Sequence, residues 1–112
     1  MIAKVSSVAL VGMDAQPVEV EVAFAGGLPE FHVVGLPSTA VRESRARVKS
    51  AIVSSQEVWP TQKITASLAP GDLRKEGALL DLPLAVAVLS AAGRLPAERA
   101  GRYLLVGELA LD

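Results

Sequence analysis

Apolar and polar side chains alternate strictly along residues 18–24, which is the pattern of a β-strand with one buried and one solvated face. The apolar face consists of Val18, Val20, Val22 and Phe24. Similar runs rich in β-branched residues predict further strands elsewhere in the chain. The expected strands cover residues 4–12, 18–27, 31–35, 62–70 and 103–112. The first two, joined by a turn at residues 13–17, should pair as an antiparallel hairpin.

A period of three to four residues runs through residues 36–56 and predicts an amphipathic helix. Its expected inner stripe consists of Val41, Ser44, Val48, Ala51, Ile52 and Ser55. Pro, Ser and Thr at positions 37–39 supply the signals that start a helix. Glu43 precedes Arg47 by four residues, which is the favourable spacing for an ion pair along a helix.

A second helix is expected near the end of the chain, because residues 84–92 are apolar nearly all round and should be buried. Asp81 is expected to cap its start, with Pro83 in the first turn, and Gly93 to end it. Residues 96–102 predict one more helical turn. The order β-β-β-α-β-α-β predicts an α+β fold, with a mixed sheet and two helices on one of its faces.

The composition fits a folded domain. The chain has 112 residues, of which 51% are apolar and 21% charged, so it can bury a core. We expect residues 1–112 to form one domain, and the strand that stops at Asp112 suggests a fragment of a longer protein. The absence of cysteine agrees with a reducing, cytoplasmic compartment. The longest apolar stretch, residues 78–89, is too short to span a bilayer, so no membrane partner is expected.

Three cations recur at steps of three and four residues along the first helix. Arg42, Arg45 and Lys49 would form one basic stripe that could contact the phosphate groups of DNA. Arg74 and Lys75, in the loop before the second helix, are further candidates. The alternative is an ordinary solvated helix face, which the net charge of −1 favours because no overall basic field supports DNA binding.

The sequence lacks the usual motifs for nucleotide and metal binding. It has no glycine-rich loop followed by a lysine and a hydroxyl residue, which would hold the phosphates of a nucleotide. His32 is the single histidine and is expected in a strand. Glu19 and Glu21 are expected on a solvated strand face, although two carboxylates at this spacing could hold a cation. We expect no metal or cofactor in this chain.

The turn before the second helix has the charges of an active site but lacks an attacking hydroxyl. Nucleophilic catalysis needs a Ser, Thr, Cys or Lys that a neighbouring base or desolvation activates. Within residues 74–89 only Lys75 has such a side chain, and Leu79 stands where a hydroxyl would emerge at the helix entrance. Ser38 or Ser67 would need a distant base, and each fits better as a helix start or an outward strand residue. No catalytic residue is therefore expected.

Four stretches of the chain together resemble one protein family. They read GLPSTAVRESRARVKSAIVSS, ITASLAPGDLRKEG, DLPLAVAVL and VGELALD, and they cover nearly the whole chain in order. This pattern is similar to the N-terminal domain of the ComM/YifB family of bacterial AAA+ ATPases, also called magnesium chelatase subunit ChlI-like. The resemblance implies a fold like the proteolytic domain of Lon protease, which a ribosomal-protein domain and the C-terminal domain of the repair ATPase RadA share.

The resemblance to Lon also bears on the turn before the second helix. In Lon the nucleophilic serine lies in a turn of the form P-K-D-G-P-S-A-G. When Lys75, Glu76 and Gly77 are placed on its K-D-G, Leu79 takes the position of the serine. The lysine partner of that serine would fall after Asp112. The resemblance thus implies a Lon-type scaffold without its nucleophile, as the residues themselves indicate.

The resemblance implies a role for the parent protein. Its ATP and Mg²⁺ would bind in an AAA+ module that follows this chain, and the protein would form a ring, most simply a hexamer. ComM is associated with branch migration of DNA during natural transformation, so this chain would be a non-catalytic accessory domain that aids ring assembly or DNA engagement. Two alternatives stay open: a Lon-type peptidase domain, and a component of magnesium chelatase, which the family name suggests.

Overall fold

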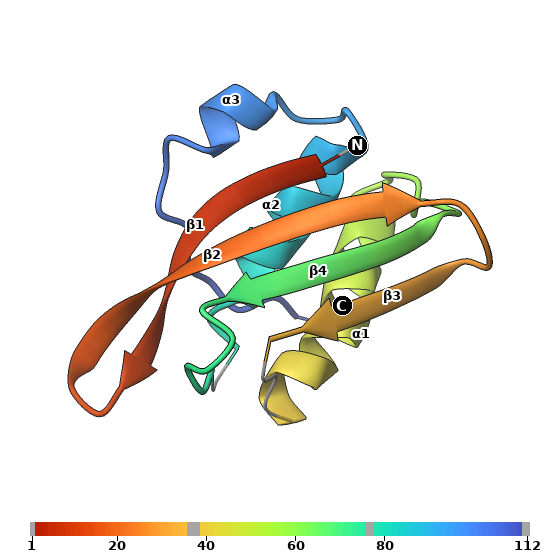
Figure 1. Ribbon diagram of the computed structural model, residues 1–112. Helices are drawn as coiled ribbons and strands as arrows, with labels where there is room; N and C mark the ends of the chain where they lie inside the picture. Colours follow the sequence, from red (N-terminus) through yellow and green to blue (C-terminus); the bar gives the residue numbers. More distant parts are fainter. Residues whose placement is uncertain (1, 36–38, 76–77, 111–112) are drawn as a thin grey trace.

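The computed structural model describes residues 2–35, 39–75 and 78–110 (Figure 1). Along the chain, three strands precede a long helix, a fourth strand follows it, and two helices come last. The elements are β1 (Ile2–Val11), β2 (Asp14–Ala25), β3 (Glu30–Val34), α1 (Thr39–Ser54), β4 (Lys63–Ala69), α2 (Asp81–Ala91) and α3 (Ala97–Ala100).

The four strands form one mixed sheet in the order β1-β2-β4-β3. β1 pairs antiparallel with β2, and β2 pairs antiparallel with β4. β3 and β4 are parallel neighbours, and α1 makes the crossover that parallel strands require. The predicted α+β class with a mixed sheet is thus confirmed, whereas the likeness to the Lon proteolytic domain stays a prediction.

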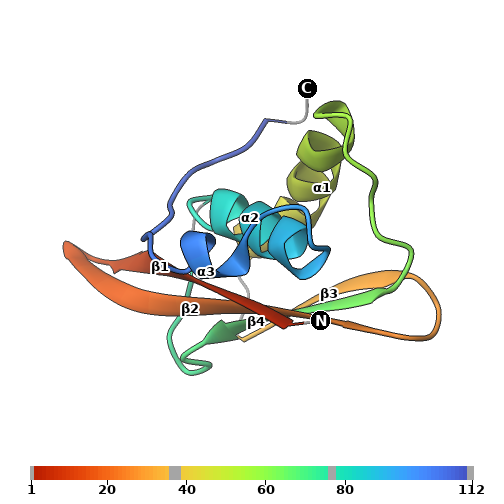
Figure 2. The same cartoon turned by 90° about the horizontal axis from the view of Figure 1, so that it is seen from above.

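The helices lie together on one face of the sheet, as Figure 2 shows from above. The alternation along the strands decides which face this is, because apolar side chains at every second position must be covered. The buried core includes Val5 of β1, the valines of β2, Ile64 and Leu68 of β4, Val41, Val48 and Ile52 of α1, and Leu84 and Val88 of α2. The other face carries Glu19, Glu21 and the polar residues of β4, and none of the described helices covers it.

The hairpin between β1 and β2 is longer than the sequence predicted. Its turn consists of Gly12 and Met13, and Gly12 has a φ of +62°, which glycine adopts without strain. β2 therefore begins at Asp14, and the predicted turn at residues 13–17 is wrong beyond its first residue. Pro17 is tolerated because this part of β2 precedes its pairing with β4, which starts at Glu19.

The predicted helices exist, with two corrections at their ends. The inner stripe of α1 is buried at Val41, Ser44, Val48 and Ile52, whereas Ser55 lies beyond the helix and is exposed. The expected start signals at residues 37 and 38 lie outside the described residues. Asp81 does not cap α2, because Leu80 occupies the cap position and the Asp81 carboxylate binds elsewhere.

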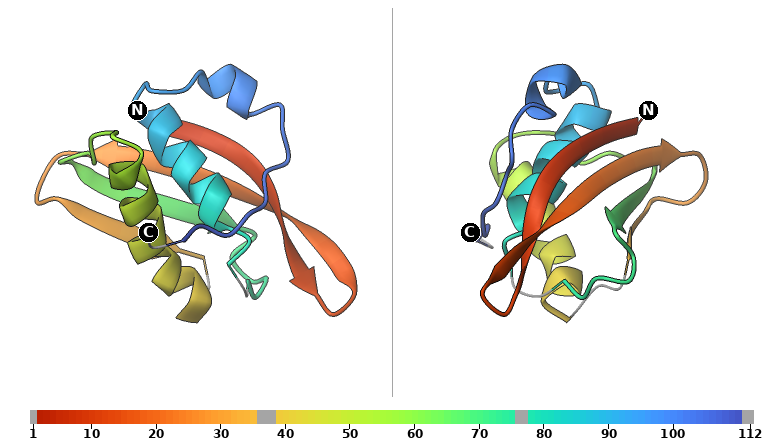
Figure 3. Two further views of the ribbon diagram at one scale, coloured as in Figure 1. Left: turned by 180° about the vertical axis from the view of Figure 1, so that it is seen from behind. Right: turned by 60° about the vertical axis from the view of Figure 1, so that its left-hand side comes forward.

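The fifth predicted strand is absent from the described part of residues 103–112. Residues 103–110, here called the strap, touch β1 at one parallel bridge between Ser6 and Leu104 and then leave the sheet. The strap runs past the entrance of α2 toward α1 (Figure 3). The helical layer offers it hydrogen bonds: the Gly107 N–H donates to the Leu79 carbonyl, and the Leu82 N–H donates to the Gly107 carbonyl.

No helix in the described ranges combines the length and the apolar character that crossing a bilayer demands.

Candidate functional site

Two basic regions contain the residues that the sequence singled out: the entrance of α2 and the outer face of α1. At the entrance of α2, Lys75 is fully buried. Its ammonium group donates to three carbonyl oxygens: Gly35 at 2.8 Å, Pro70 at 2.6 Å and Leu73 at 2.7 Å. These bonds use every N–H of the protonated amine. Lys75 therefore links its own loop to Gly35, the residue that follows β3.

Burial of the Lys75 amine disfavours its charged form. It lowers the pKa of Lys75 below the usual value, because desolvation penalises the charged form, and the nearby Asp72 carboxylate offsets part of the effect. A buried ammonium whose N–H groups are all bonded has nothing left to offer a phosphate. The structure thus argues against Lys75 as a DNA contact, although it was one of the predicted ones.

The second buried charge at this entrance is Asp81. Its carboxylate accepts two hydrogen bonds from Arg47 of α1, Nε to Oδ2 at 2.7 Å and Nη2 to Oδ1 at 3.3 Å. Oδ2 also accepts the backbone N–H of Leu109 in the strap, at 3.0 Å. One carboxylate thus joins α1, α2 and the strap.

Arg47 is the cation of this junction. Asp81 raises the pKa of Arg47 above its usual value, chiefly through the hydrogen bond, and Glu108 and Glu43 add to this. The predicted pairing with Glu43 exists but is secondary, because its closest distance is 3.9 Å and the glutamate is exposed. Sequence spacing finds a partner four residues away, but cannot find the buried partner 34 residues away.

The hydroxyl that peptidase chemistry would need has no obvious source in this region. Leu79 is half-buried just before α2, and its carbonyl accepts the Gly107 N–H of the strap. Ser67 is exposed on the outer face of β4, opposite Glu21 of β2, as expected of an outward strand residue. Ser38 lies outside the described residues.

The outer face of α1 is the second region. Arg42, Arg45 and Lys49 are all exposed there. The Arg45 side chain reaches the carbonyl of Phe31 in β3 at 3.5 Å, and the Lys49 ammonium lies 5.8 Å from the centre of the Trp59 ring. The structure therefore brings Arg45 and Lys49 to the same side of the molecule, toward β3. Arg74 is exposed in the loop after β4.

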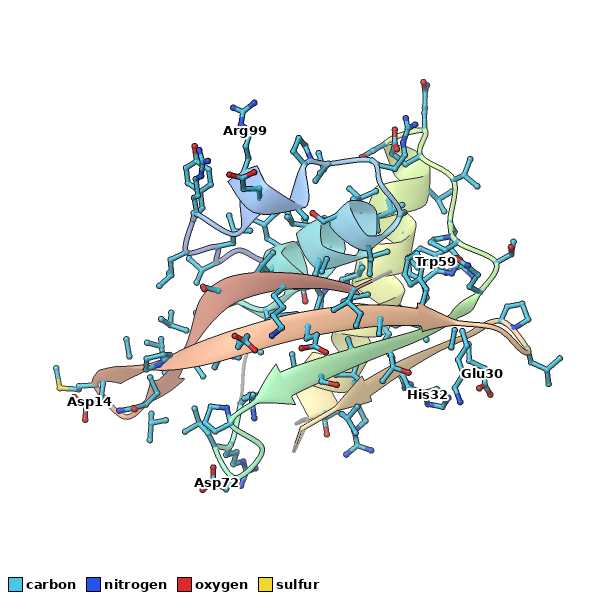
Figure 4. All side chains as sticks on the ribbon, turned by 45° about the horizontal axis from the view of Figure 1, so that its top comes forward. Asp14, Glu30, His32, Trp59, Asp72 and Arg99 are labelled. Atoms are coloured by element: carbon cyan, nitrogen blue, oxygen red, sulfur yellow. The ribbon has the colours of Figure 1, made fainter. Side chains whose placement is uncertain are left out.

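A hollow of about 420 Å³ lies between α1, β3 and the loop that leads to β4. We call it the basic hollow; its walls include Glu30, Phe31, Arg45, Lys49 and Trp59. Trp59 also lines a neighbouring hollow of about 500 Å³ beside Phe24 and the end of α2. Figure 4 shows Trp59, Glu30 and His32 toward one end of the sheet.

Two of the residues considered as metal ligands, His32 and Glu21, pair with neighbouring side chains. His32 is exposed and its Nε2 lies 3.0 Å from a carboxylate oxygen of Glu30. Glu21 pairs with Lys4 across β1 and β2 at 3.6 Å. Among the described residues, no three histidine or acidic side chains come close enough together to suggest a metal site.

Comparison with known proteins decides the family. The family model for subunit ChlI of Mg-chelatase matches residues 20–112, most of the chain. YifB of Escherichia coli is 52% identical over 103 residues, 92% of this chain and 20% of YifB. The competence protein ComM of Haemophilus influenzae is 43% identical over 110 residues, 98% of this chain and 22% of ComM. The chain belongs to the ComM/YifB family.

The family prediction made from four short motifs is thereby confirmed. The chain spans about a fifth of the length of YifB and ComM. In this ComM/YifB domain the candidate cations have different surroundings. Lys75 is buried before α2, whereas its neighbour Arg74 and the three cations of α1 are exposed.

Sequence reasoning missed the aromatic side chains of the basic hollow. Phe31 and Trp59 approach each other with ring centres 5.4 Å apart and ring planes 57° apart. They are 28 positions apart in the sequence, and neither falls on the helix that carries the cations. One signal was present: Trp59 is the single tryptophan and follows the exposed Val58 in a loop.

Proposed function

We propose that this chain is a non-catalytic accessory domain of a ComM-like AAA+ ATPase, and that it aids ring assembly and DNA engagement during branch migration. The observation that carries the non-catalytic part is the state of Lys75. The one lysine of the turn before α2 is buried with all its N–H groups on carbonyl oxygens, and the residue at the helix entrance is Leu79. Such a turn has neither an attacking hydroxyl nor an available amine.

The part of the proposal that concerns DNA is supported by the outer face of α1. Three cations at helical spacing are exposed there, and phosphate contacts of this kind provide affinity without reading sequence. The parent protein would supply the ATP and Mg²⁺ site and form a hexameric ring in the cytoplasm. The nucleotide site and the ring come from the family resemblance, and the cytoplasmic compartment is expected from the absence of cysteine.

The experiment on assembly and DNA uses a full-length family member that contains this domain. We expect that deletion of the domain weakens ring formation with ATP, measured by mass photometry, and slows branch migration of a four-way DNA junction. A deletion that leaves both unchanged would contradict the accessory role.

The experiment on catalysis uses the 112-residue chain. It should not cleave a fluorogenic protein substrate, and an active-site-directed phosphonate should not label it. We also expect Leu79→Ser to remain inactive, because the lysine that pairs with the serine in Lon would fall after Asp112 and the nearby Lys75 is bonded to three carbonyls. Cleavage by the wild-type chain that depends on Ser67 or Ser38 would instead support the Lon-type peptidase.

A role in metal insertion is the second candidate, because the matching family model describes a Mg-chelatase subunit. It predicts that the full-length protein supports ATP-dependent insertion of Mg²⁺ into a porphyrin when the other chelatase subunits are present. Branch migration without such insertion would favour the first proposal.

A further inference from the structure

The basic hollow combines two kinds of side chain that the sequence keeps apart. Arg45 and Lys49, one turn apart on α1, form one wall. The other walls include Phe31 of β3 and Trp59 of the loop between α1 and β4. Its volume of about 420 Å³ falls in the range of roughly 300–1,000 Å³ that is usual for pockets that take small molecules or parts of larger ones. Its ligand should therefore have both an anionic and a flat apolar part.

The cations of this hollow are held near its rings. The Lys49 ammonium lies over the Trp59 ring, where the negative face of the indole attracts a cation. The Arg45 guanidinium donates to the carbonyl of Phe31 in β3 at 3.5 Å and to the carbonyl of Arg42 in its own helix at 3.2 Å. Both side chains remain exposed, so an anion can reach them without unfolding any element.

The rings offer a surface for stacking. Phe31 and Trp59 are only half-buried, and their rings make a tilted contact. Base–aromatic stacking tolerates any base, because every base has a flat π-face. A duplex cannot use this surface, since its bases are already stacked on one another.

One acidic residue also borders the hollow. Hydrogen bonding and attraction from His32 lower the pKa of Glu30, so its carboxylate is ionised at neutral pH. A phosphate in the hollow would be repelled by this charge, whereas a cationic ligand would be attracted. Replacing Glu30 therefore tests directly whether the ligand carries a negative or a positive charge.

We propose that the basic hollow binds single-stranded nucleic acid, with Arg45 and Lys49 on adjacent phosphates and a base stacked on Trp59. This rests on the DNA part of the proposed function and deepens it, because it names the strand form and the residues. Arg42, one turn before Arg45 on the same face, extends the cationic track along α1.

Trp59 makes the experiment selective. It is the single tryptophan of the chain, and it lines both the basic hollow and the neighbouring hollow, so its fluorescence reports on ligands at either of them. Only the basic hollow contains Arg45 and Lys49, so variants of these two residues separate the two sites. We expect an oligo-dT of about twelve nucleotides to quench that fluorescence, and a duplex of equal length or an oligonucleotide of abasic sites to quench it far less. Binding is measured in parallel by the anisotropy of the labelled oligonucleotide.

The charge variants then test the phosphate contacts. Arg45→Glu together with Lys49→Glu should weaken binding on the order of 10- to 100-fold at low salt, and should reduce the slope of log affinity against log salt by about 1.4. Glu30→Gln should instead strengthen binding. The matched control is Arg99→Glu on α3, an exposed cation that Figure 4 shows far from Trp59.

Three results would overturn the proposal. Binding without quenching would place the oligonucleotide elsewhere, and equal losses from Arg99→Glu would show only general charge attraction. Equal competition by polyglutamate or by the duplex would show that the hollow takes anions without using the ring. Circular dichroism checks that each variant is folded, and Trp59→Phe adds a milder change of the ring.

This outcome can be separated from that of the proposed function. Ring assembly is measured on the full-length protein without DNA, so it does not depend on the basic hollow. Loss of oligonucleotide binding with normal assembly would remove this inference alone, whereas normal binding with unaffected assembly after domain deletion would remove the assembly role alone.

Discussion

Lys75 and Lys49 carry the same ammonium group, and the fold places them in opposite surroundings. Lys75 is fully buried before α2 and donates to three backbone carbonyls. Lys49 is exposed on α1 and lies over the Trp59 ring. Both were predicted to contact phosphates, because a sequence shows a charge and its spacing but not its solvation.

The comparison extends to the two regions as wholes. At the entrance of α2, the buried charges of Lys75 and Asp81 have every partner inside the fold, and their removal would leave polar groups without water or hydrogen bonds. On the outer face of α1, the charged side chains are exposed, so water can take the place of any partner that a substitution removes. Buried charges should therefore control stability, and exposed ones should control binding.

The largest effect should come from Asp81→Ala. Removing this carboxylate takes the main partner from Arg47 and the acceptor from the Leu109 N–H. Because the break of a buried pair leaves an uncompensated group, we expect the free energy of unfolding to fall by about 3–5 kcal/mol, measured by urea denaturation. The matched control, Glu21→Ala in the exposed pair with Lys4, should cost less than about 1 kcal/mol. Similar costs for the two would contradict the distinction between buried and exposed charges.

The two lysines themselves allow a direct contrast. Lys75→Met keeps the length of the side chain but leaves three carbonyls without their donor, so we expect a loss of about 2–3 kcal/mol in the free energy of unfolding. Lys49→Met should change it by no more than about 0.5 kcal/mol, as is usual at exposed positions. Equal losses would show that the three hydrogen bonds of the Lys75 ammonium stabilise the fold no more than the exposed ammonium of Lys49 does.

A smaller effect should appear in the pH dependence. Burial lowers the pKa of Lys75 in the folded chain, whereas in the unfolded chain it stays near 10.4. Between these two values the unfolded state binds more protons, so wild-type stability should rise with pH. The gap in unfolding free energy between wild type and Lys75→Met should therefore widen as the pH approaches about 10.4. If the gap narrows instead, the hydrogen bonds to the three carbonyls favour the charged amine by more than desolvation disfavours it.

The smallest effect should come from Arg42→Gln on the exposed stripe. Its side chain is solvated, so we expect a change of no more than about 0.5 kcal/mol in the free energy of unfolding, measured by thermal denaturation. A loss above 1 kcal/mol would reveal a structural role that the comparison does not assign to this face.

Local periodicity was enough to predict most of the fold. The alternation from Val18 to Phe24 defined the buried face of β2, and the stripe from Val41 to Ile52 defined the inner face of α1. Both patterns arise because a regular backbone repeats its orientation within a few residues. The motifs that carried the family resemblance are also local, and the family was confirmed.

The prediction of a fifth strand was wrong because tertiary contacts, which no local sequence pattern shows, decide where this segment bonds. Residues 103–110 are mostly apolar and include the β-branched Val106, but the edge of β1 competes with the helical layer for their backbone groups. Leu79, Asp81 and Leu82 provide hydrogen bonds there, and the strap leaves the sheet to make them.

The sequence by itself thus determined the elements, their inner faces and the family. Only the tertiary structure decided what each charge does, because the partners are distant in the chain: Lys75 lies 40 positions from Gly35, and Arg47 lies 34 from Asp81. It also brought Trp59 beside Phe31 and Lys49. Solvation and partnership of a charged group depend on everything that packs around it, and that packing is complete only when α1, α2 and the strap meet over the sheet.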